Sequence, residues 1–138
     1  MQRKKIYRCD TLIEKTKLYD VPAIEMARQI IETDPSERLS ISTLAAKVGI
    51  NEFKLKLGFR ELFKTSPHKY LVRLRLDKAK ELLAETDCTV QEIADKTGFE
   101  SYCGLSVAFK NAFTISPSQF RRQLEVYYTD SVLVYKMQ

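Results

Sequence analysis

Hydrophobic residues recur at helical spacing in two similar stretches of the chain. In the later stretch, the i, i+3, i+4, i+7 pattern of a buried helix face falls on Leu105, Ala108, Phe109 and Ala112. A shorter helix is predicted just before it, because Thr89 and Glu92 have the T-x-x-E spacing of a capping box. Cys88 can pack on Ile93 in front of that cap, as a hydrophobic staple does. Two amphipathic helices are therefore expected in close succession.

A glycine turn separates these two predicted helices. Gly98 can take the left-handed conformation that ends a helix and turns the chain sharply. Ser101 can then cap the second helix. Two helices joined at a steep angle by a short glycine turn form a helix-turn-helix, so residues 89–113 are predicted to form this motif.

The same pattern occurs upstream, at residues 40–64. Before the turn the copies match at an offset of 49 residues (89 minus 40), which pairs Ser40, Leu44, Ala45, Lys47 and Gly49 with Thr89, Ile93, Ala94, Lys96 and Gly98. After the turn the offset is 50 (105 minus 55), which pairs Leu55, Phe59, Arg60, Phe63, Ser66, Pro67 and Tyr70 with Leu105, Phe109, Lys110, Phe113, Ser116, Pro117 and Phe120. Matches of this kind in one register indicate a true internal repeat.

Two segments carry a resemblance to a known family. LRLDKAKELLAETDCTVQEIADKTGFES and FKNAFTISPSQFRR resemble the linking helix and second helix-turn-helix of the DNA-binding domain of AraC/XylS bacterial transcription regulators. The resemblance extends from about Ile41 to Arg122. It implies an all-α fold of about seven helices, with two helix-turn-helix subdomains joined by a rigid central linking helix. It also implies a sequence-specific, double-stranded DNA-binding regulator, in particular an activator.

The chain is long enough for one domain with a modest core, at 138 residues of which 44% are hydrophobic. The expected organisation is an N-terminal arm or linker at 1–20, a DNA-binding domain at 21–125, and a C-terminal tail at 126–138. Inside the domain, a first helix runs from Pro22 to before Pro35. The sensor domain usual in the family does not fit, so the chain is either a short stand-alone member or the DNA-binding portion of a longer protein.

The linking helix is predicted at about 67–85, with Ser66 as its cap and Pro67 at its first position. Its apolar face is predicted to consist of Tyr70, Leu71, Leu74, Ala79, Leu82 and Leu83. Much of its charge is expected to form ordinary pairs along the helix surface. At a rise of roughly 1.5 Å per residue it would span about 27 Å, which suits two units that read major-groove segments about 34 Å apart.

In the first unit, Asn51 can cap the second helix, whose buried face is predicted to be Leu55, Phe59, Leu62 and Phe63. The opposite stripe, predicted to enter the major groove, consists of Glu52, Phe53, Lys56, Leu57 and Arg60. The family resemblance places base contacts at Phe53, Lys56 and Leu57. An exposed Phe53 and Leu57 would contact either thymine methyl groups or a neighbouring helix, and the sequence leaves both open.

In the second unit, the predicted DNA-facing residues are Ser101, Tyr102, Cys103, Ser106, Val107 and Lys110. The family often has Arg or other polar residues at the positions of Cys103 and Val107, and Gly at that of Thr114, so Arg-guanine readout is not expected from this unit. Cys103 is either a small residue tolerated near DNA or a redox-sensitive thiol. Ser118, Arg121 and Arg122 follow a predicted helix start at Pro117, where the helix N-terminus can bind phosphate.

The charge of the chain favours an anionic partner without specifying nucleic acid, because the net charge is +5 and the pI is about 9.1. The basic arm would either touch DNA phosphates or act as a solvated linker. The tail has an apolar run from Val132 to Tyr135, which would pack back on the domain, pair as a strand, or meet a partner.

Other classes of protein find little support in the sequence. There is no apolar run near 18 residues and no signal-peptide core, so neither membrane nor export is expected and the cytoplasm is predicted. The three cysteines, including Cys9, lack metal or disulfide spacing. With His68 as the one histidine and four dispersed glycines, no enzyme activity, cofactor or metal is expected. The alternative function is a helical module that binds RNA polymerase or a partner regulator.

Overall fold

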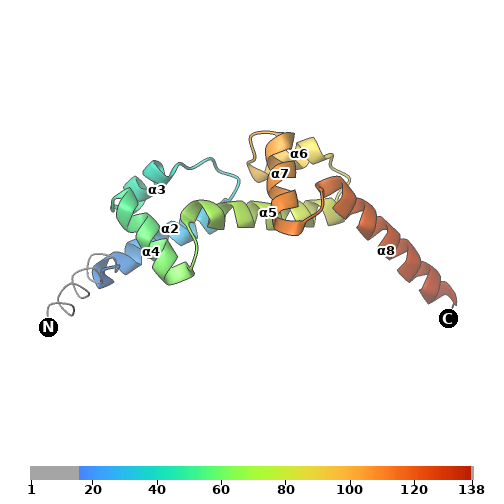
Figure 1. Ribbon diagram of the computed structural model, residues 1–138, viewed down its shortest axis with the longest axis horizontal. Coiled ribbons are helices and arrows are strands. Elements are labelled where there is room, and N and C mark those ends of the chain that lie inside the picture. The colour runs from blue at the N-terminus through green and yellow to red at the C-terminus, as the bar shows by residue number, and fades with distance from the viewer. Residues whose placement is uncertain (1–15, 138) are drawn as a thin grey trace. The chain divides into compact units, whose positions relative to one another are not determined.

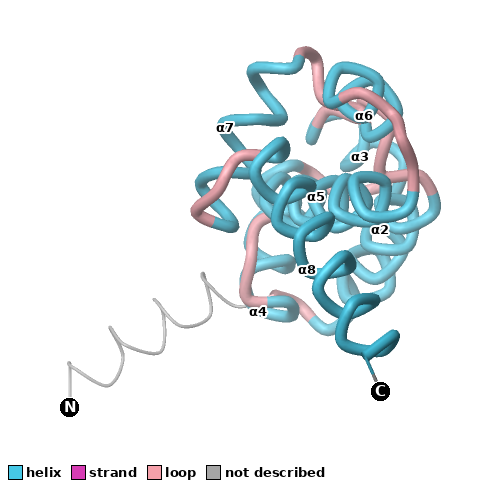
Figure 2. The backbone as a smooth tube through the Cα atoms, turned by 90° about the vertical axis from the view of Figure 1, so that its right-hand side faces the viewer, coloured by secondary structure: helices cyan, strands magenta, loops and turns pink. Residues whose placement is uncertain are grey.

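The structure, a computed structural model, describes the backbone of residues 16–137 and the side chains of residues 16–130. In this range it contains a 3-10 turn and seven α-helices, namely η1 (Leu18–Asp20), α2 (Val21–Thr33), α3 (Ile41–Val48), α4 (Glu52–Phe63), α5 (Pro67–Glu85), α6 (Val90–Thr97), α7 (Tyr102–Phe113) and α8 (Pro117–Met137) (Figure 1). Figure 2 shows helices and loops alone over the same residues, which confirms the all-α prediction. None of these helices is both long and apolar enough to cross a bilayer. Residues 1–15 of the predicted arm lie outside the described residues.

The chain divides into two compact units, Met1–Leu71 and Val72–Gln138. The first contains α2, α3, α4 and the first turn of α5, and the second contains the remainder of α5 with α6, α7 and α8. Each unit therefore holds one helix-turn-helix, as the repeat predicts. The linking helix begins in one unit and supplies packing surface to the other.

The predicted caps fix the helix-turn-helix geometry in both units. The side chains of Ser40 and Thr89 accept hydrogen bonds from the backbone N–H groups of Thr43 and Glu92. Asn51 and Ser101 cap α4 and α7 in the same way, accepting from the backbones of Lys54 and Gly104. Each such cap is worth about 1 kcal/mol, so the starts of all four helices are encoded locally.

The glycine turns are also equivalent in the two units. Gly49 and Gly98 have φ values of +78° and +89°, in the left-handed region that favours glycine. The residue after each glycine donates its backbone N–H to the carbonyl of Ala45 or Ala94, at 3.2 and 3.0 Å. This bond pattern is that of a Schellman motif, so the sharp turn follows directly from the repeated A-x-x-x-G sequence.

A buried phenylalanine anchors the second helix of each motif. Phe59 is fully buried and meets Phe63 and Tyr70 edge to face, with ring centroids 5.0 and 5.8 Å apart. Phe109 meets Phe113 and Phe120 in the same way, at 4.7 and 5.6 Å. Edge-to-face pairs add about 0.5–1.5 kcal/mol each beyond the burial of their area. The third ring comes from the helix that follows the motif, so each aromatic set packs that helix against its motif.

The repeat extends to the helix that supports each motif, beyond the residues matched by sequence. In α2 the buried positions are Ile24, Ala27 and Ile31, and in the second unit α5 buries Leu76, Ala79 and Leu83. These sets lie 52 residues apart (76 minus 24) with the same spacing. The cations Arg28 and Lys80 share this offset and lie over the equivalent rings of Phe63 and Phe113, at 5.5 and 4.6 Å.

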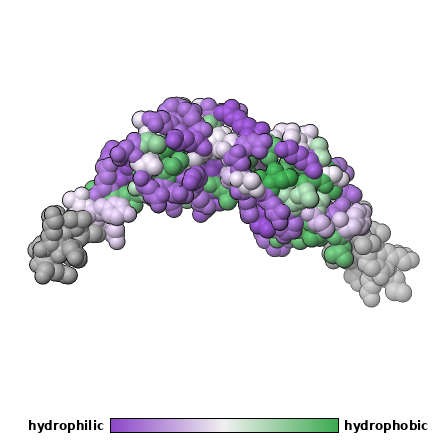
Figure 3. Space-filling model, turned by 180° about the vertical axis from the view of Figure 1, so that it is seen from behind, coloured by the Kyte–Doolittle hydropathy of each residue, from purple (hydrophilic) through white to green (hydrophobic). Residues whose placement is uncertain are grey.

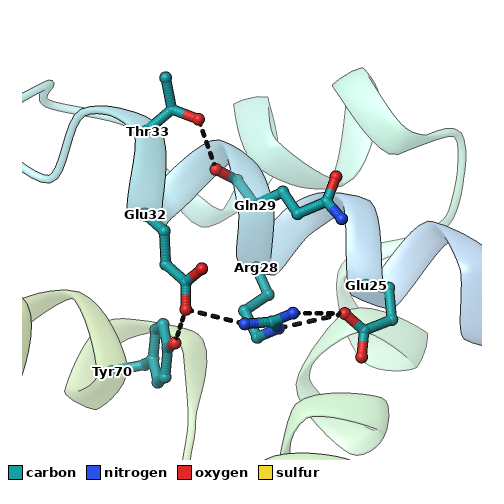
Figure 4. Close-up of polar contacts among 6 residues, drawn as sticks. All are labelled: Glu25, Arg28, Gln29, Glu32, Thr33 and Tyr70. Carbon is teal, nitrogen blue, oxygen red and sulfur yellow. Dashed lines mark hydrogen bonds and ion pairs between the residues drawn. The ribbon is translucent and has the colours of Figure 1, made fainter.

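A polar network secures the supporting helix of the first unit. Figure 4 shows Arg28 between Glu25 and Glu32 of α2, and its guanidinium donates to both carboxylates at 2.9 Å. The hydroxyl of Tyr70, in α5, donates to the same Glu32 carboxylate. The hydrogen bonds with Glu25 and Tyr70 raise the pKa of Arg28, and burial followed by the bond to Glu32 raises the pKa of Tyr70. The network ties α2 to the start of α5.

Three predicted burial assignments were wrong. Leu62 is 40% exposed, and Ala112, at the equivalent position of α7, is exposed as well. Both lie in the last turn of their helices. Helical periodicity predicts that they face the core, but the residues of the aromatic set occupy the covered side of that turn. Leu76, absent from the predicted face of α5, is buried. The single face predicted for α5 combined two sets, because its first turn packs in one unit and its later turns in the other.

Two non-glycine residues have left-handed backbone at the helix ends. Lys64 and Thr114 have φ values of +61° and +68° just after α4 and α7. For a β-branched residue such as Thr114 this conformation is strained, which accounts for the glycine that the family resemblance implies there. Downstream, α8 continues without a break past residue 125, so the tail left unassigned by sequence has helical backbone to Met137.

Arg121 closes the C-terminal end of α5. Its guanidinium donates to the backbone carbonyls of Leu83 and Thr86, both at 3.2 Å. The last carbonyls of a helix lack partners within the helix and carry partial negative charge. The half-buried Arg121 therefore joins α8 to the end of α5 inside the second unit.

We expect Gly58→Ala to destabilise the protein by about 1–3 kcal/mol, because overpacking forces neighbours to shift. A Cβ on Gly58 would lie 1.9 Å from the Cδ1 atom of the fully buried Ile24. Gly104→Ala is the matched control on α7, where the nearest atom is the Ser101 hydroxyl oxygen at 3.5 Å. It should be neutral or stabilising by up to about 1 kcal/mol. Chemical denaturation measures both, and equal effects would contradict this packing.

We expect Arg121→Ala to lower the free energy of unfolding by about 1–3 kcal/mol, since hydrogen bonds from a charged donor to two helix-end carbonyls are lost. Arg122→Ala should change it by less than about 0.5 kcal/mol, because the neighbouring Arg122 side chain is exposed. The same denaturation measurement compares them. A larger loss for Arg122→Ala would show that the two arginines have been assigned the wrong roles.

Candidate nucleic-acid interface

The predicted stripe of α4 lies on the surface of the first unit. Glu52, Lys56 and Arg60 are exposed, Leu57 is half-buried, and Phe53 is 64% exposed. The buried residues of the same helix, Leu55 and Phe59, lie on its opposite side. This face of α4 thus presents two cations and an anion around a large aromatic ring.

The equivalent stripe of α7 lies at an offset of 50 residues and is less charged. Tyr102 and Val107 are 45% and 61% exposed, and Cys103 and Lys110 are exposed. The positions of Lys56 and Leu57 in α4 correspond to Ser106 and Val107 here. Lys110, equivalent to Arg60, is the one cation among these stripe positions.

Two hydroxyl groups of the second predicted set are either used in a helix cap or buried. The Ser101 side chain accepts a hydrogen bond from the Gly104 backbone N–H, at 3.1 Å, as the cap of α7. The hydroxyl oxygen of Ser106 is buried and has no hydrogen-bond partner among the described residues. The predicted residues of α7 whose side chains are exposed are therefore Tyr102, Cys103, Val107 and Lys110.

At the start of α8, the three remaining predicted contacts differ in exposure and in hydrogen bonding. Ser118 and Arg122 are exposed there. Ser116 and Gln119 cap the helix reciprocally: each side chain accepts from the backbone N–H of the other, at 3.2 and 3.0 Å. Arg121 instead turns to the end of α5. The repeat offers a signal for this difference, because Arg121 occupies the position of the buried Leu71 at an offset of 50.

Residues beside α4 that the sequence did not single out complete the first unit's candidate face. Thr16 donates to the Glu61 carboxylate through both its backbone N–H and its hydroxyl. Lys54 forms an ion pair with the buried Asp20, at 3.6 Å. Next to these contacts lies a hollow of about 120 Å³, which is lined by Thr16, Lys17, Asp20, Asn51, Phe53, Lys54 and Leu57. Phe53 and Leu57 therefore border this segment.

No group of three or more potential metal ligands occurs between residues 16 and 130. Cys88 is half-buried in the core of the second unit, and Cys103 is exposed. On the face drawn in Figure 3, hydrophilic residues predominate and hydrophobic residues form separate patches. The helices α4 and α7 are the equivalent second helices of the two repeated motifs, and they carry the predicted stripes.

Comparison with known proteins supports this assignment of the motif. The model of a helix-turn-helix domain family matches residues 44–123. A transcriptional regulator from Chromobacterium violaceum, described as containing an AraC-type DNA-binding domain, is 30% identical with a TM-score of 0.68, over 78% of this chain and 96% of that one. The DNA-binding domain of AdpA, a global transcriptional factor solved with a target DNA, is 25% identical with a TM-score of 0.72, over 75% and 94% of the two chains.

Among curated proteins, the Msm operon regulatory protein of Streptococcus mutans is 28% identical over 110 residues. The match covers 80% of this chain but 38% of that protein, and two further regulators are covered over 44% and 33% of their lengths. The chain thus spans less than half the length of these curated relatives. With the helix-turn-helix model matching more than half of its residues, the chain belongs to the AraC-type helix-turn-helix family.

Proposed function

We propose that this chain is a sequence-specific DNA-binding transcription regulator that reads two adjacent major-groove segments with α4 and α7. One observation carries the proposal. Two equivalent helices, capped and turned in the same way, present exposed stripes at positions 50 residues apart in a chain of the AraC-type family. The similar AdpA domain was solved with its target DNA.

Each unit has the parts that such docking needs. In helix-turn-helix proteins the second helix lies in the major groove with its N-terminal residues against the bases, while the first crosses the backbone. In this chain the caps at Asn51 and Ser101 fix the N-terminal turns of α4 and α7. The buried Phe59 and Phe109 hold the opposite face of each helix in the core, so the stripe is presented without rearrangement.

The two units should contribute unequally. Lys56 and Arg60 are exposed donors on α4 that can reach guanine acceptors or phosphates. On α7, Tyr102 and Val107 offer apolar contact with thymine methyl groups, and Lys110 supplies a charge. Readout by this second unit therefore depends on shape and methyl contacts more than on hydrogen bonds to guanine.

The start of α8 supplies backbone contacts in this proposal. Its reciprocally capped N-terminus carries partial positive charge. Ser118 and Arg122 are exposed beside it. We further propose that the DNA-binding domain comprises residues 21–125, acts as an activator in the cytoplasm, and works with RNA polymerase and, where the natural chain is longer, with a sensor domain.

One observation favours protein binding as an alternative function. Beyond the core of the second unit, α8 exposes Val126, Tyr127 and Tyr128, at 56%, 66% and 59%. Exposed aromatic residues are enriched at protein interfaces. A helical interaction module is therefore the alternative function, and DNA binding by the α4 stripe distinguishes the two.

We expect the affinity for duplex DNA to fall steeply with salt. Lys56, Arg60, Lys110 and Arg122 are exposed cations on the proposed interface, and each phosphate neutralised contributes about −0.9 to the slope of log affinity against log salt. These four alone predict a slope of about −3 to −4. Fluorescence anisotropy between about 50 and 200 mM salt measures it. Binding that does not respond to salt would favour the protein-interaction alternative.

We expect Lys56→Ala to weaken binding and relax specificity in one half-site by about 1–3 kcal/mol, the worth of a good base contact. Val107→Ala should cost less, in the other half-site, because a valine makes only apolar contact there. Val107→Arg should increase the preference for guanine at that position. Titrating the three variants against single-base changes in each half gives the comparison. A larger cost for Val107→Ala, with discrimination lost mainly in the second half-site, would reverse this assignment.

A further inference from the structure

The second unit has an arginine where the first unit has a leucine. Arg121 of α8 donates hydrogen bonds to the backbone carbonyls of Leu83 and Thr86 at the end of α5, both at 3.2 Å. The equivalent position in the first unit, 50 residues earlier, is Leu71. Leu71 is buried, and its side chain has no hydrogen-bond donor. It therefore cannot bond to the end of α2, the supporting helix of its own unit.

The carbonyls bonded by that arginine have equivalents at the end of α2. The two supporting helices are related by an offset of 52 residues, which pairs Leu83 with Ile31 (83 minus 52) and Thr86 with Asp34 (86 minus 52). The last carbonyls of a helix lack partners within the helix and carry partial negative charge. A cationic donor at this place would therefore meet equivalent backbone groups in both units.

Both carbonyls at the end of α2 can accept from such a donor. The N–H that would bond to the Ile31 carbonyl in a continuing helix belongs to Pro35, which has no N–H. The Asp34 carbonyl accepts from the Glu37 N–H at 3.1 Å, and a carbonyl oxygen has a second lone pair. The first unit thus keeps the acceptors of this interaction while lacking the arginine.

A cavity of about 160 Å³ lies at this place in the first unit. Its lining includes Ile31, Asp34 and Leu71, the equivalents of the three residues that these hydrogen bonds join in the second unit. An engineered cavity of about 150 Å³ is large enough to bind benzene. The cavity of the first unit therefore suits a group of about that size, such as a guanidinium with a short carbon chain.

Two carboxylates give this cavity a negative lining. Asp34 and Glu37 line it, and no lysine or arginine is among the described residues that do. Glu37 lies in a loop that is three residues longer than its counterpart, because the offset between the units falls from 52 at Asp34 to 49 at Ser40. The remaining wall is mainly aliphatic and includes Leu44 and Leu71. A guanidinium suits such a site, because it is planar, donates several hydrogen bonds and is more weakly hydrated than an ammonium.

We propose that this cavity binds a small alkylguanidinium molecule. Its planar group donates to the carbonyls of Ile31 and Asp34 and pairs with the Asp34 carboxylate, while its carbon chain lies against the aliphatic wall. The bound molecule joins the end of α2 to the start of α5, as Arg121 joins the end of α5 to α8. The site lies within the first unit and does not depend on DNA binding, so it adds a ligand to the proposed function.

NMR titration of the full chain with butylguanidinium tests the site. Amide resonances of residues at the cavity, such as Leu39, Leu44 and Leu71, should shift and saturate at millimolar concentrations, far below those at which guanidinium unfolds proteins. Butylurea has nearly the same shape without the charge. It should bind about ten-fold more weakly or less, because hydrogen bonds from a charged donor are roughly twice as strong as neutral ones.

Two variants locate the bound molecule. Asp34→Asn should weaken butylguanidinium binding about ten-fold, since it removes the charge partner. Asp77→Asn is the matched control, the same substitution at an exposed position of α5 outside the cavity, and it should leave the affinity unchanged. Leu71→Arg should abolish the shifts, because its own guanidinium would occupy the site as Arg121 does in the second unit. If this variant does not fold, Asp34→Asn gives the same test without altering the core.

Four results would overturn the proposal. Shifts that do not saturate, or that butylurea reproduces at the same concentration, would show that no charge-assisted site exists. Equal losses in Asp34→Asn and Asp77→Asn would indicate general electrostatic attraction. Binding that survives in folded Leu71→Arg would place the molecule elsewhere. Tighter binding of acetylarginine amide than of butylguanidinium would assign the site to an arginine of a partner protein. None of these results involves DNA, so the DNA-reading role of α4 would stand.

Discussion

The burial of one phenylalanine in each unit is the constraint on which the structure depends. Phe59 and Phe109 are fully buried on the inner faces of α4 and α7 and pack against rings from their own helix and from the next one. Each therefore fixes the rotation of the second helix of its motif about that helix's own axis. Because side chains project by residue position around a helix, holding one face in the core determines which residues form the outer stripe.

Local sequence determined most of the secondary structure, because caps and turns act within a few residues. The four capping side chains and the two left-handed glycines were predictable from spacing alone, as was the placement of the repeat. Burial was harder to predict. Leu62 and Ala112 have the periodicity of core residues, yet both are exposed, and both lie in the final turn of their helices, where the aromatic set occupies the covered side. Leu76 was missed because α5 packs a different face in each unit.

Some features of the candidate site were likewise predictable from local sequence, and others were not. The exposed stripes of α4 and α7 follow from the helical repeat, so their positions were predictable, although their contact with DNA is a proposal. The inward orientation of Arg121 depends on the carbonyls of Leu83 and Thr86, which lie 35 to 38 residues away in sequence. Likewise, the docking of Thr16 on Glu61 joins residues 45 positions apart. Such contacts come from tertiary structure, which local pattern does not describe.

The features that the two units share, and the surface residues in which they differ, together explain how a single chain would bind two different half-sites. The two units share their core, caps and turns, and they differ on the surface, where α4 carries Lys56 and Arg60 and α7 carries Ser106 and Lys110 at the same positions. Equivalent frameworks with different stripes should read different half-sites in the same chain direction. A protein of this kind does not require a two-fold symmetric operator or a second subunit, unlike helix-turn-helix dimers.

Selection of bound sequences from a random duplex pool, combined with measurement of the protein-to-DNA ratio in the selected complex, tests this account most directly. We expect one chain to bind an asymmetric or directly repeated site of about 20 bp, made of two half-sites one helical turn apart. A strictly two-fold symmetric consensus bound only by dimers would contradict it.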